Sequence, residues 1–239
     1  MAKGALERAA RLLDRLGDNQ AELTVPELAS DAGMPISTAY RLLAELEQYG
    51  LVQRRPDATV VLGTRMVALG RTAEEGLRER LVEPARRPMA RLSEEAGETA
   101  ILTVPCGLEG IVLHAVETER HSVRLSYTLY RRAPMHRGAS GKILAAHLEP
   151  AEQGRLLVAV GLPALVNELA EIRREGLAVT FGELDPGAGA VAAPILDRRG
   201  EIVAGLSVAG PVPRINARLA TLRPAVIETA QQIERAYQS

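Results

Sequence analysis

The 239-residue chain has a net charge of −1 and contains 46% hydrophobic and 25% charged residues. This composition indicates a globular protein long enough for two modest domains, and it argues against a protein that coats nucleic acid non-specifically. A single cysteine excludes an intrachain disulfide. We find neither the apolar core of a signal peptide nor a run of the roughly 18 to 20 apolar residues that cross a bilayer, so we expect a cytoplasmic protein without a membrane partner.

The N-terminal quarter of the chain is predicted to form three helices and a hairpin. Apolar residues recur at helical spacing over residues 5–16, and the sequence that begins at Thr24 has the pattern of a capped helix start. A third helix is expected to begin after Pro35 and to end at Gly50. Short apolar runs on either side of residues 53–59 predict the hairpin.

The rest of the chain mixes helices and strands. Residues 64–95 have a helical, arginine-rich pattern, with breaks expected near Pro84 and Pro88. Strands are expected at 99–104, 110–116 and 123–127, helices at 140–148 and 165–175, a hairpin formed by 191–196 and 202–208, and a last helix at 219–237. Because these elements do not alternate as in βαβ units, the sequence predicts an α+β fold.

A short helix, a glycine turn and a second helix describe a helix-turn-helix, which places the start of its second helix in the DNA major groove. The candidate DNA-contacting residues are those able to donate to phosphates or bases: Thr24, Ser37, Thr38, Tyr40, Arg41 and, on a wing formed by the hairpin, Arg54 and Arg55. A bidentate contact from Arg41 to guanine would be worth about 1–3 kcal/mol of discrimination. Polar residues at helix starts also serve as simple caps, so an ordinary amphipathic helix pair remains an alternative.

Residues 5–63 resemble the winged helix-turn-helix of IclR-type transcriptional regulators, through LTVPELASDAGMPISTAYRLLAELEQYGLVQR and LGTRMVALG. The resemblance continues in the family's order through RPMARLSEEAGETAIL, APMHRGASGKILAAHL, IRREGLAVTFGEL and AVAAPILDRRGEIVAGLSVAGP. Two positions depart from the family pattern. Ile36 stands where a basic or polar residue is usual, and Tyr130 stands where a glycine often precedes the basic pair Arg131–Arg132.

The resemblance implies a winged helix-turn-helix DNA-binding domain at 1–63, a helical linker at 64–78 that pairs two subunits, and a GAF-like effector-binding and oligomerisation domain at 79–239. It implies a cavity for a small organic or aromatic acid, lined at matching positions by Leu125, Ala139, Ser140, Thr180, Ala188, Ala190, Ser207 and Ala209. Thr180 and Ala209 stand where an acidic residue and a hydroxyl are common, so a less polar pocket is expected. The small residues of this set are equally compatible with tight helix–sheet packing.

The glycine-rich segment from Gly138 to Gly141 offers a seat for a carboxylate, because backbone N–H groups at the start of a helix favour an anion. Gly141 is therefore the ninth residue predicted to bind the effector. GASGK at 138–142 and GAGAVA at 187–192 lack the spacing or the context of nucleotide-binding loops. Cys106 has no base linked to it by a motif, and the four histidines lack metal-ligand spacing. We therefore expect no catalytic residue, no metal site and no cofactor.

The leading hypothesis is a ligand-responsive bacterial transcriptional regulator that is not an enzyme. It would bind double-stranded operator DNA as a homodimer or homotetramer, and act as a repressor or an activator. Two alternatives stay open. One is a small-molecule-binding interaction module whose helix-turn-helix contacts protein, and the other is an enzyme that uses Cys106 or a His/Asp pair in the C-terminal fold.

Overall fold

The computed structural model describes residues 4–18 and 22–238 and divides the chain into two compact units. The N-terminal unit comprises residues 1–77 and the C-terminal unit residues 78–239. Helices and strands occur in both, as the predicted α+β class requires. No helix among the described residues is both long and apolar enough to cross a membrane.

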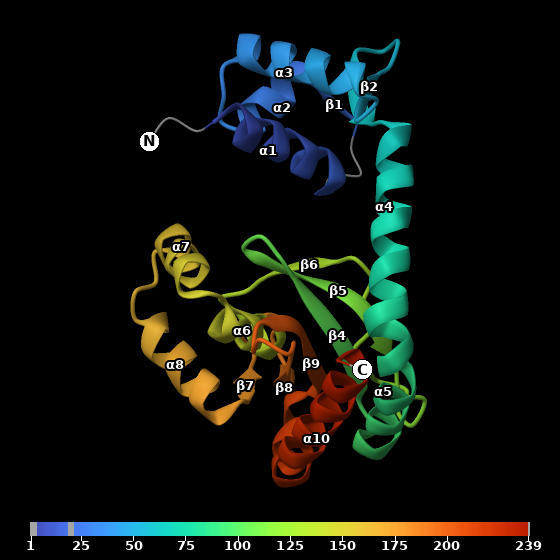
Figure 1. The fold of residues 1–239 in the computed structure, drawn as a ribbon, viewed down its shortest axis with the longest axis vertical. Helices are drawn as coiled ribbons and strands as arrows, with labels where there is room; N and C mark the ends of the chain where they lie inside the picture. The colour runs from blue at the N-terminus through green and yellow to red at the C-terminus, as the bar shows by residue number, and fades with distance from the viewer. Residues whose placement is uncertain (1–3, 19–21, 239) are drawn as a thin grey trace. The chain divides into compact units, whose positions relative to one another are not determined.

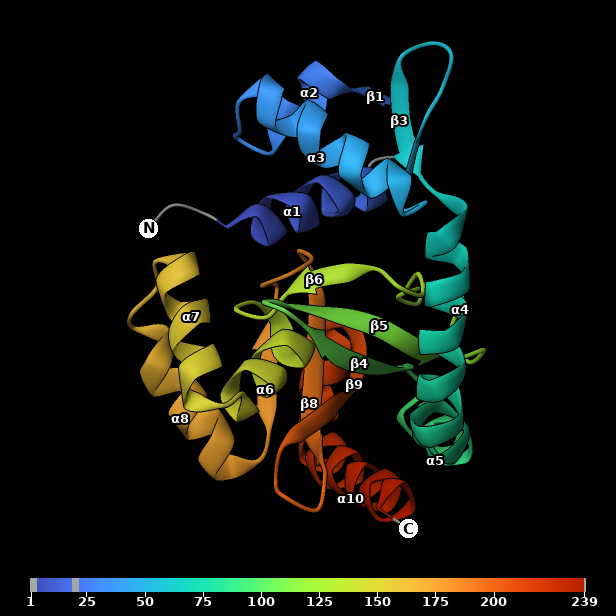
Figure 2. The same cartoon turned by 45° about the horizontal axis from the view of Figure 1, so that its top comes forward.

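The N-terminal unit packs three helices against a small sheet (Figure 2). The helices are α1 (Ala5–Asp18), α2 (Val25–Asp31) and α3 (Ile36–Gln48), and the antiparallel sheet has the order β1 (Leu23–Thr24), β3 (Thr59–Leu62), β2 (Val52–Arg54). Leu12, Leu28 and Leu43 are fully buried in its core. The three helices and the hairpin are confirmed, whereas the two-residue strand β1 was not foreseen.

A capping box starts α2. The Glu27 carboxylate accepts hydrogen bonds from the Thr24 hydroxyl at 2.7 Å and from the Thr24 backbone N–H at 2.8 Å. The bond from the Thr24 hydroxyl, followed by the bond from its backbone, lowers the pKa of Glu27. Pro26 occupies the first turn, where its missing N–H costs no helical bond.

Helical backbone continues from α4 (Thr64–Leu77) through a π-helical segment, Arg78–Val82, into α5 (Glu83–Ala96). The irregularity lies just before Pro84, close to the first expected break. The second expected break is wrong, because α5 continues through Pro88 to Ala96. Ala85 and Met89, on either side of it, are buried in the core, and this packing offsets the backbone hydrogen bond that Pro88 cannot donate.

The C-terminal unit is built on a six-stranded antiparallel sheet (Figure 1). Its order is β6 (Arg132–Pro134), β5 (Glu109–Val116), β4 (Thr99–Cys106), β9 (Ile202–Pro211), β8 (Ala188–Leu196), β7 (Ala178–Phe181). The β8–β9 hairpin is confirmed, and β7 was missed. The strand expected at 123–127 is wrong, because the Leu125 carbonyl accepts a 2.6 Å bond from the Thr99 hydroxyl and the strand at this edge is β6.

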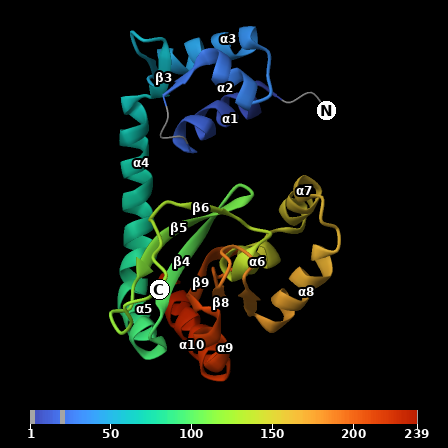
Figure 3. The same cartoon turned by 180° about the vertical axis from the view of Figure 1, so that it is seen from behind.

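Helices cover both faces of this sheet (Figures 1 and 3). On one face lie α5, α9 (Val212–Ala217) and α10 (Leu219–Tyr237), packed against the alternate residues of β4, β8 and β9 that include Leu102 and Leu206. On the other lies α6 (Gly138–His147), with α7 (Pro150–Val160) and α8 (Leu165–Glu175) outside it. The helices expected at 140–148 and 165–175 are confirmed, and α7 was missed.

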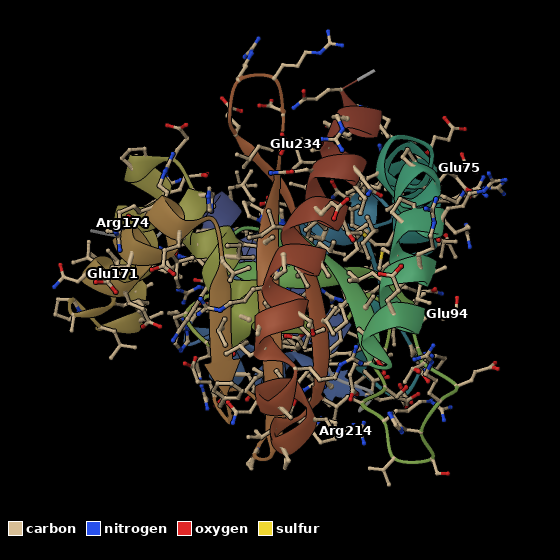
Figure 4. The ribbon with its side chains drawn as sticks, turned by 90° about the horizontal axis from the view of Figure 1, so that it is seen from below. Glu75, Glu94, Glu171, Arg174, Arg214 and Glu234 are labelled. Atoms are coloured by element: carbon tan, nitrogen blue, oxygen red, sulfur yellow. The ribbon has the colours of Figure 1, made fainter. Side chains whose placement is uncertain are left out.

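Two charged groups hold α9 and α10 to the sheet, and Figure 4 shows them near opposite ends of α10. Glu234 accepts a 2.8 Å bond from the backbone N–H of Leu196. Arg214 donates to the Glu98 carboxylate, with Nη2 at 2.8 Å from Oε2. The Glu98 side chain is 3% exposed, so this ion pair compensates a carboxylate removed from water.

Gly63, between β3 and α4, should not tolerate a side chain. A Cβ there would lie 2.1 Å from the carbonyl oxygen of Gly50, and neither backbone segment is free to retreat. We expect Gly63→Ala to destabilise the protein by about 1–3 kcal/mol in urea unfolding followed by circular dichroism. Gly70→Ala, inside α4 with nothing within 4 Å of the new Cβ, should instead stabilise it by up to about 1 kcal/mol. Equal stability of the two variants would contradict this account.

Candidate functional site

The first turns of α3 present polar groups on an exposed face. Ser37, Tyr40 and Arg41 are exposed, and Thr38 is half-buried. The opposite face buries Ala39, Leu42 and Leu43 against α1 and α2. The predicted recognition residues of the second helix therefore lie together at one end of α3. Ile36 is also exposed, at the position where the family usually has a polar residue.

The three candidate arginines all face carboxylates of their own unit. Arg41 is ion-paired with Glu45 at 3.0 Å, and Arg55 with Glu22. These pairs are exposed, so each contributes at most about 1 kcal/mol and a phosphate can compete for the guanidinium.

Arg54 differs from the other two because it is tied to α3. Its Nη2 donates to the Tyr40 carbonyl at 3.3 Å, and its guanidinium carbon lies 5.6 Å from the centre of the Tyr40 ring. Glu47 accepts the Arg54 backbone N–H at 3.0 Å. Arg54 therefore fixes the hairpin to the recognition helix. Thr24 has a similar structural task, because its hydroxyl is bound to Glu27.

In the C-terminal unit a cavity lies between the start of α6 and the sheet, and its empty volume is about 710 Å³, including the part open to solvent. Seven of the nine predicted effector residues line it: Ala139, Ser140, Gly141, Thr180, Ala188, Ala190 and Ala209. Most of this lining is apolar, with hydroxyl groups between.

The other two predicted residues lie outside the lining. The Ser207 hydroxyl is 2.8 Å from that of Ser140, so Ser207 positions a cavity residue from behind. Leu125 packs against the cluster formed by Ile101, Val112 and Ala209. Both residues therefore support the wall of the cavity.

Sequence reasoning missed most of the charged residues around the cavity. Arg131, Arg137, Glu183 and Asp185 all line it, and none belongs to a helix or strand. The Arg131 guanidinium lies 3.9 Å from the Asp185 carboxylate, and Arg137 donates to the backbone carbonyl of Glu183. The one sequence feature that could have indicated them is the basic pair Arg131–Arg132. Hydrophobic periodicity gives no position for a residue in an irregular segment, so it could not assign Arg131 to the cavity.

The expected carboxylate seat at the start of α6 is partly filled by the chain itself. The Glu183 carboxylate accepts the Gly138 backbone N–H at 3.0 Å and the Lys142 ammonium at 2.7 Å. Lys142 also donates to Glu168 at 2.6 Å, and its side chain is 7% exposed. Burial lowers the pKa of Lys142, but its hydrogen bonds to the two glutamates outweigh that effect and leave the pKa raised. The group therefore remains an ammonium ion at neutral pH and joins α6, α8 and the β7–β8 loop.

Tyr127 adds a phenol to the cavity lining. Burial, with a smaller contribution from Asp185, raises the pKa of Tyr127. The phenol is therefore protonated at neutral pH and can donate a hydrogen bond to a ligand.

The side chains considered for other chemistry lie apart from this cavity. Cys106 is a free, exposed thiol at the end of β4. Burial lowers the pKa of His114 and of His147, whose Nδ1 lies 2.9 Å from the Ile143 carbonyl. Within residues 4–18 and 22–238, no three His, Cys, Asp or Glu side chains are grouped so as to hold a metal ion.

Comparison with known proteins decides what this arrangement is. The IclR helix-turn-helix domain matches residues 5–56, and the bacterial transcriptional regulator IclR C-terminal domain matches residues 77–235. The HTH-type transcriptional regulator BhcR of Paracoccus denitrificans is 34% identical over 96% of this chain and 85% of its own length. The chain belongs to the IclR family. It is therefore a transcriptional regulator that binds DNA through its helix-turn-helix and senses a ligand in its C-terminal unit.

Solved structures of IclR-type regulators have the same fold. One from Silicibacter sp. TM1040 aligns with a TM-score of 0.82 at 26% identity, over 99% of this chain and 97% of its own. An IclR homologue from Microbacterium hydrocarbonoxydans, complexed with 4-hydroxybenzoate, aligns with a TM-score of 0.67 at 25% identity, over 98% of this chain and 99% of its own. The IclR fold of this chain thus extends over both units.

Proposed function

We propose that this IclR-family regulator binds its operator as a dimer and is controlled by a small carboxylic acid, organic or aromatic, that occupies the α6 cavity. The observation that carries the proposal is the composition of the cavity. Its walls are apolar, Ser140, Thr180 and Tyr127 supply hydroxyl groups, and Arg131 and Arg137 supply positive charge. An acid with an apolar body satisfies both kinds of surface. The 4-hydroxybenzoate held by the Microbacterium relative is a molecule of this class.

Ligand binding in the cavity can regulate DNA binding because the two binding equilibria are linked. An acid that binds preferentially to one arrangement of the dimer changes operator affinity by the same coupling free energy, typically about 1–3 kcal/mol. The proposal gives residues 1–63 the DNA-binding role, residues 64–78 the linker role and residues 79–239 the effector-binding role. Two recognition helices in a dimer call for half-sites about one helical turn apart, or a multiple of that spacing.

The first test is binding of the purified protein to the DNA that flanks its own gene, at two salt concentrations, with and without a panel of small carboxylic acids. We expect tight binding that weakens steeply with salt, because phosphate contacts release counterions. One acid of the panel should shift the affinity by about fivefold or more. Specific binding that ignores salt would favour the protein-interaction alternative, and consumption of the acid would favour an enzyme.

Arg41 is the residue proposed to read a base edge. Removing a bidentate contact to guanine costs about 1–3 kcal/mol, so Arg41→Ala should weaken operator binding by about fivefold or more in fluorescence anisotropy. The matched control is Arg155→Ala in α7, which removes an exposed arginine paired with Glu152 and should leave DNA binding unchanged. An Arg41→Ala protein that binds the operator like wild type would exclude this role.

Helix α4 is proposed as the dimer contact. It has no buried residue, and Met66, Leu69, Ala73 and Leu77 recur on one side at three- and four-residue spacing. Such a stripe, exposed in one chain, is typical of a helix that packs against a second copy. Leu69→Glu should therefore shift the protein from dimer to monomer in sedimentation velocity.

Val67 provides the control for that experiment. It is 73% exposed on the same helix but lies about a quarter turn or more away from the stripe, so Val67→Glu should leave the dimer intact. Dissociation by both variants, or by neither, would contradict pairing through the stripe.

A further inference from the structure

Thr103 carries a hydroxyl group in the cavity wall that the chain itself does not use. The residue lines the cavity and is only 3% exposed. Its Oγ1 has no hydrogen-bond partner within the residues that the structure describes. Leaving a buried hydroxyl unpaired is unfavourable, so such a group in a native protein calls for an explanation.

Several other buried hydroxyl groups of this unit are partnered. Thr99, four residues earlier on β4, donates to the Leu125 carbonyl at 2.6 Å. Thr229 in α10 donates to the Ala225 carbonyl at 2.8 Å, and Ser140 and Ser207 satisfy each other. The orphan hydroxyl of Thr103 is thus not a general property of threonines in this core.

A β-bulge in β5 determines which residue lies opposite Thr103. Leu102 pairs with His114 on β5, but Thr103 pairs with Val112, so the register shifts between them. The shift places Thr103 opposite Val112, and both residues line the cavity. Leu113, which an unbroken register would place opposite Thr103, packs in the core formed with α5 and α10. The bulge thus places Val112, and not Leu113, beside Thr103 at the cavity, as bulges next to binding sites commonly do.

Packing also restricts the Thr103 side chain. Its γ-methyl lies so close over Gly110 that a Cβ there would come within 2.8 Å of it, and Leu144 closes the same space at 3.1 Å. The methyl of Thr103, and not its hydroxyl, therefore fills the space over Gly110.

We propose that Thr103 determines the specificity of the effector site by hydrogen-bonding a second polar group of the ligand, separate from its carboxylate. This inference rests on the proposed function, since it takes a carboxylic acid as the occupant. Arg131 and Arg137 belong to segments outside the strands and attract the carboxylate, whereas Thr103 lies on β4 in the middle of the sheet. The effector is therefore a bifunctional acid whose second group is a hydroxyl, carbonyl or carboxyl.

The test compares matched acids by isothermal titration calorimetry: 4-hydroxybenzoate with benzoate, and 4-hydroxybutyrate with butyrate. Wild type should prefer the hydroxylated member of the pair that it binds, by about threefold to tenfold, the value of one hydrogen bond. Thr103→Val keeps the shape of the side chain without its hydroxyl and should remove that preference. Thr103→Ser keeps the hydroxyl and should retain it, as should the control Thr229→Val, which lies outside the cavity lining.

The outcomes separate this inference from the proposed function. An unchanged preference in Thr103→Val would overturn the role of Thr103 and leave acid sensing in place. Failure of wild type to bind any of the four acids would overturn both. In the ligand-free protein, Thr103→Val should melt at or above the wild-type temperature, because no protein hydrogen bond is lost. A clearly lower melting temperature would show a structural role and overturn the proposal.

Discussion

The cavity depends on an unequal contact between the two halves of α6 and the sheet. The second half carries Ile143 and Leu144, both fully buried, which press so closely on β9 that a Cβ at Gly205 would lie 2.8 Å from Ile143. The first half, Gly138 to Gly141, has no side chain larger than serine, and the strands beneath it are rich in alanine and glycine. The large residues fix the distance between helix and sheet, and the small residues leave space unfilled at that distance. If the second half of α6 also carried only small side chains, the helix could pack closely on the sheet and no cavity would remain.

That contrast explains how much of the site was predictable from the sequence. Small residues recur in order along the chain, so seven of the nine expected positions lie at the cavity. Whether they enclose space depends on Ile143 and Gly205, which meet only in the folded sheet. The charged residues at the cavity lie in irregular segments and bond to groups more than 40 residues away, as Glu183 does to Gly138 and Lys142. No local pattern encodes such contacts.

The secondary structure likewise divides into elements that local sequence predicts and elements that depend on tertiary contacts. Helices with strong periodicity and the hairpin around the DRRG turn were found, because local sequence determines them. Residues 123–127 have the alternation of a strand, yet a threonine hydroxyl holds the Leu125 carbonyl and no ladder forms. β7 and α7 were missed, since a four-residue edge strand and an eleven-residue helix with several exposed apolar residues give weak patterns. Tertiary contacts decided these segments.

The charges of the DNA-binding unit are arranged for short-range exchange of arginine partners, from carboxylate to DNA, and not for long-range attraction to DNA. Residues 1–63 carry nine acidic and seven basic residues, so the unit has no positive field that would draw it to any DNA. Arg41 and Arg55 are held by carboxylates in exposed pairs worth at most about 1 kcal/mol each. If Arg41 and Arg55 contact DNA as proposed, a phosphate or a guanine edge can replace such a carboxylate at little cost. Breaking such a pair lowers the affinity for every DNA sequence equally, so discrimination between sites depends on contacts to the base edges.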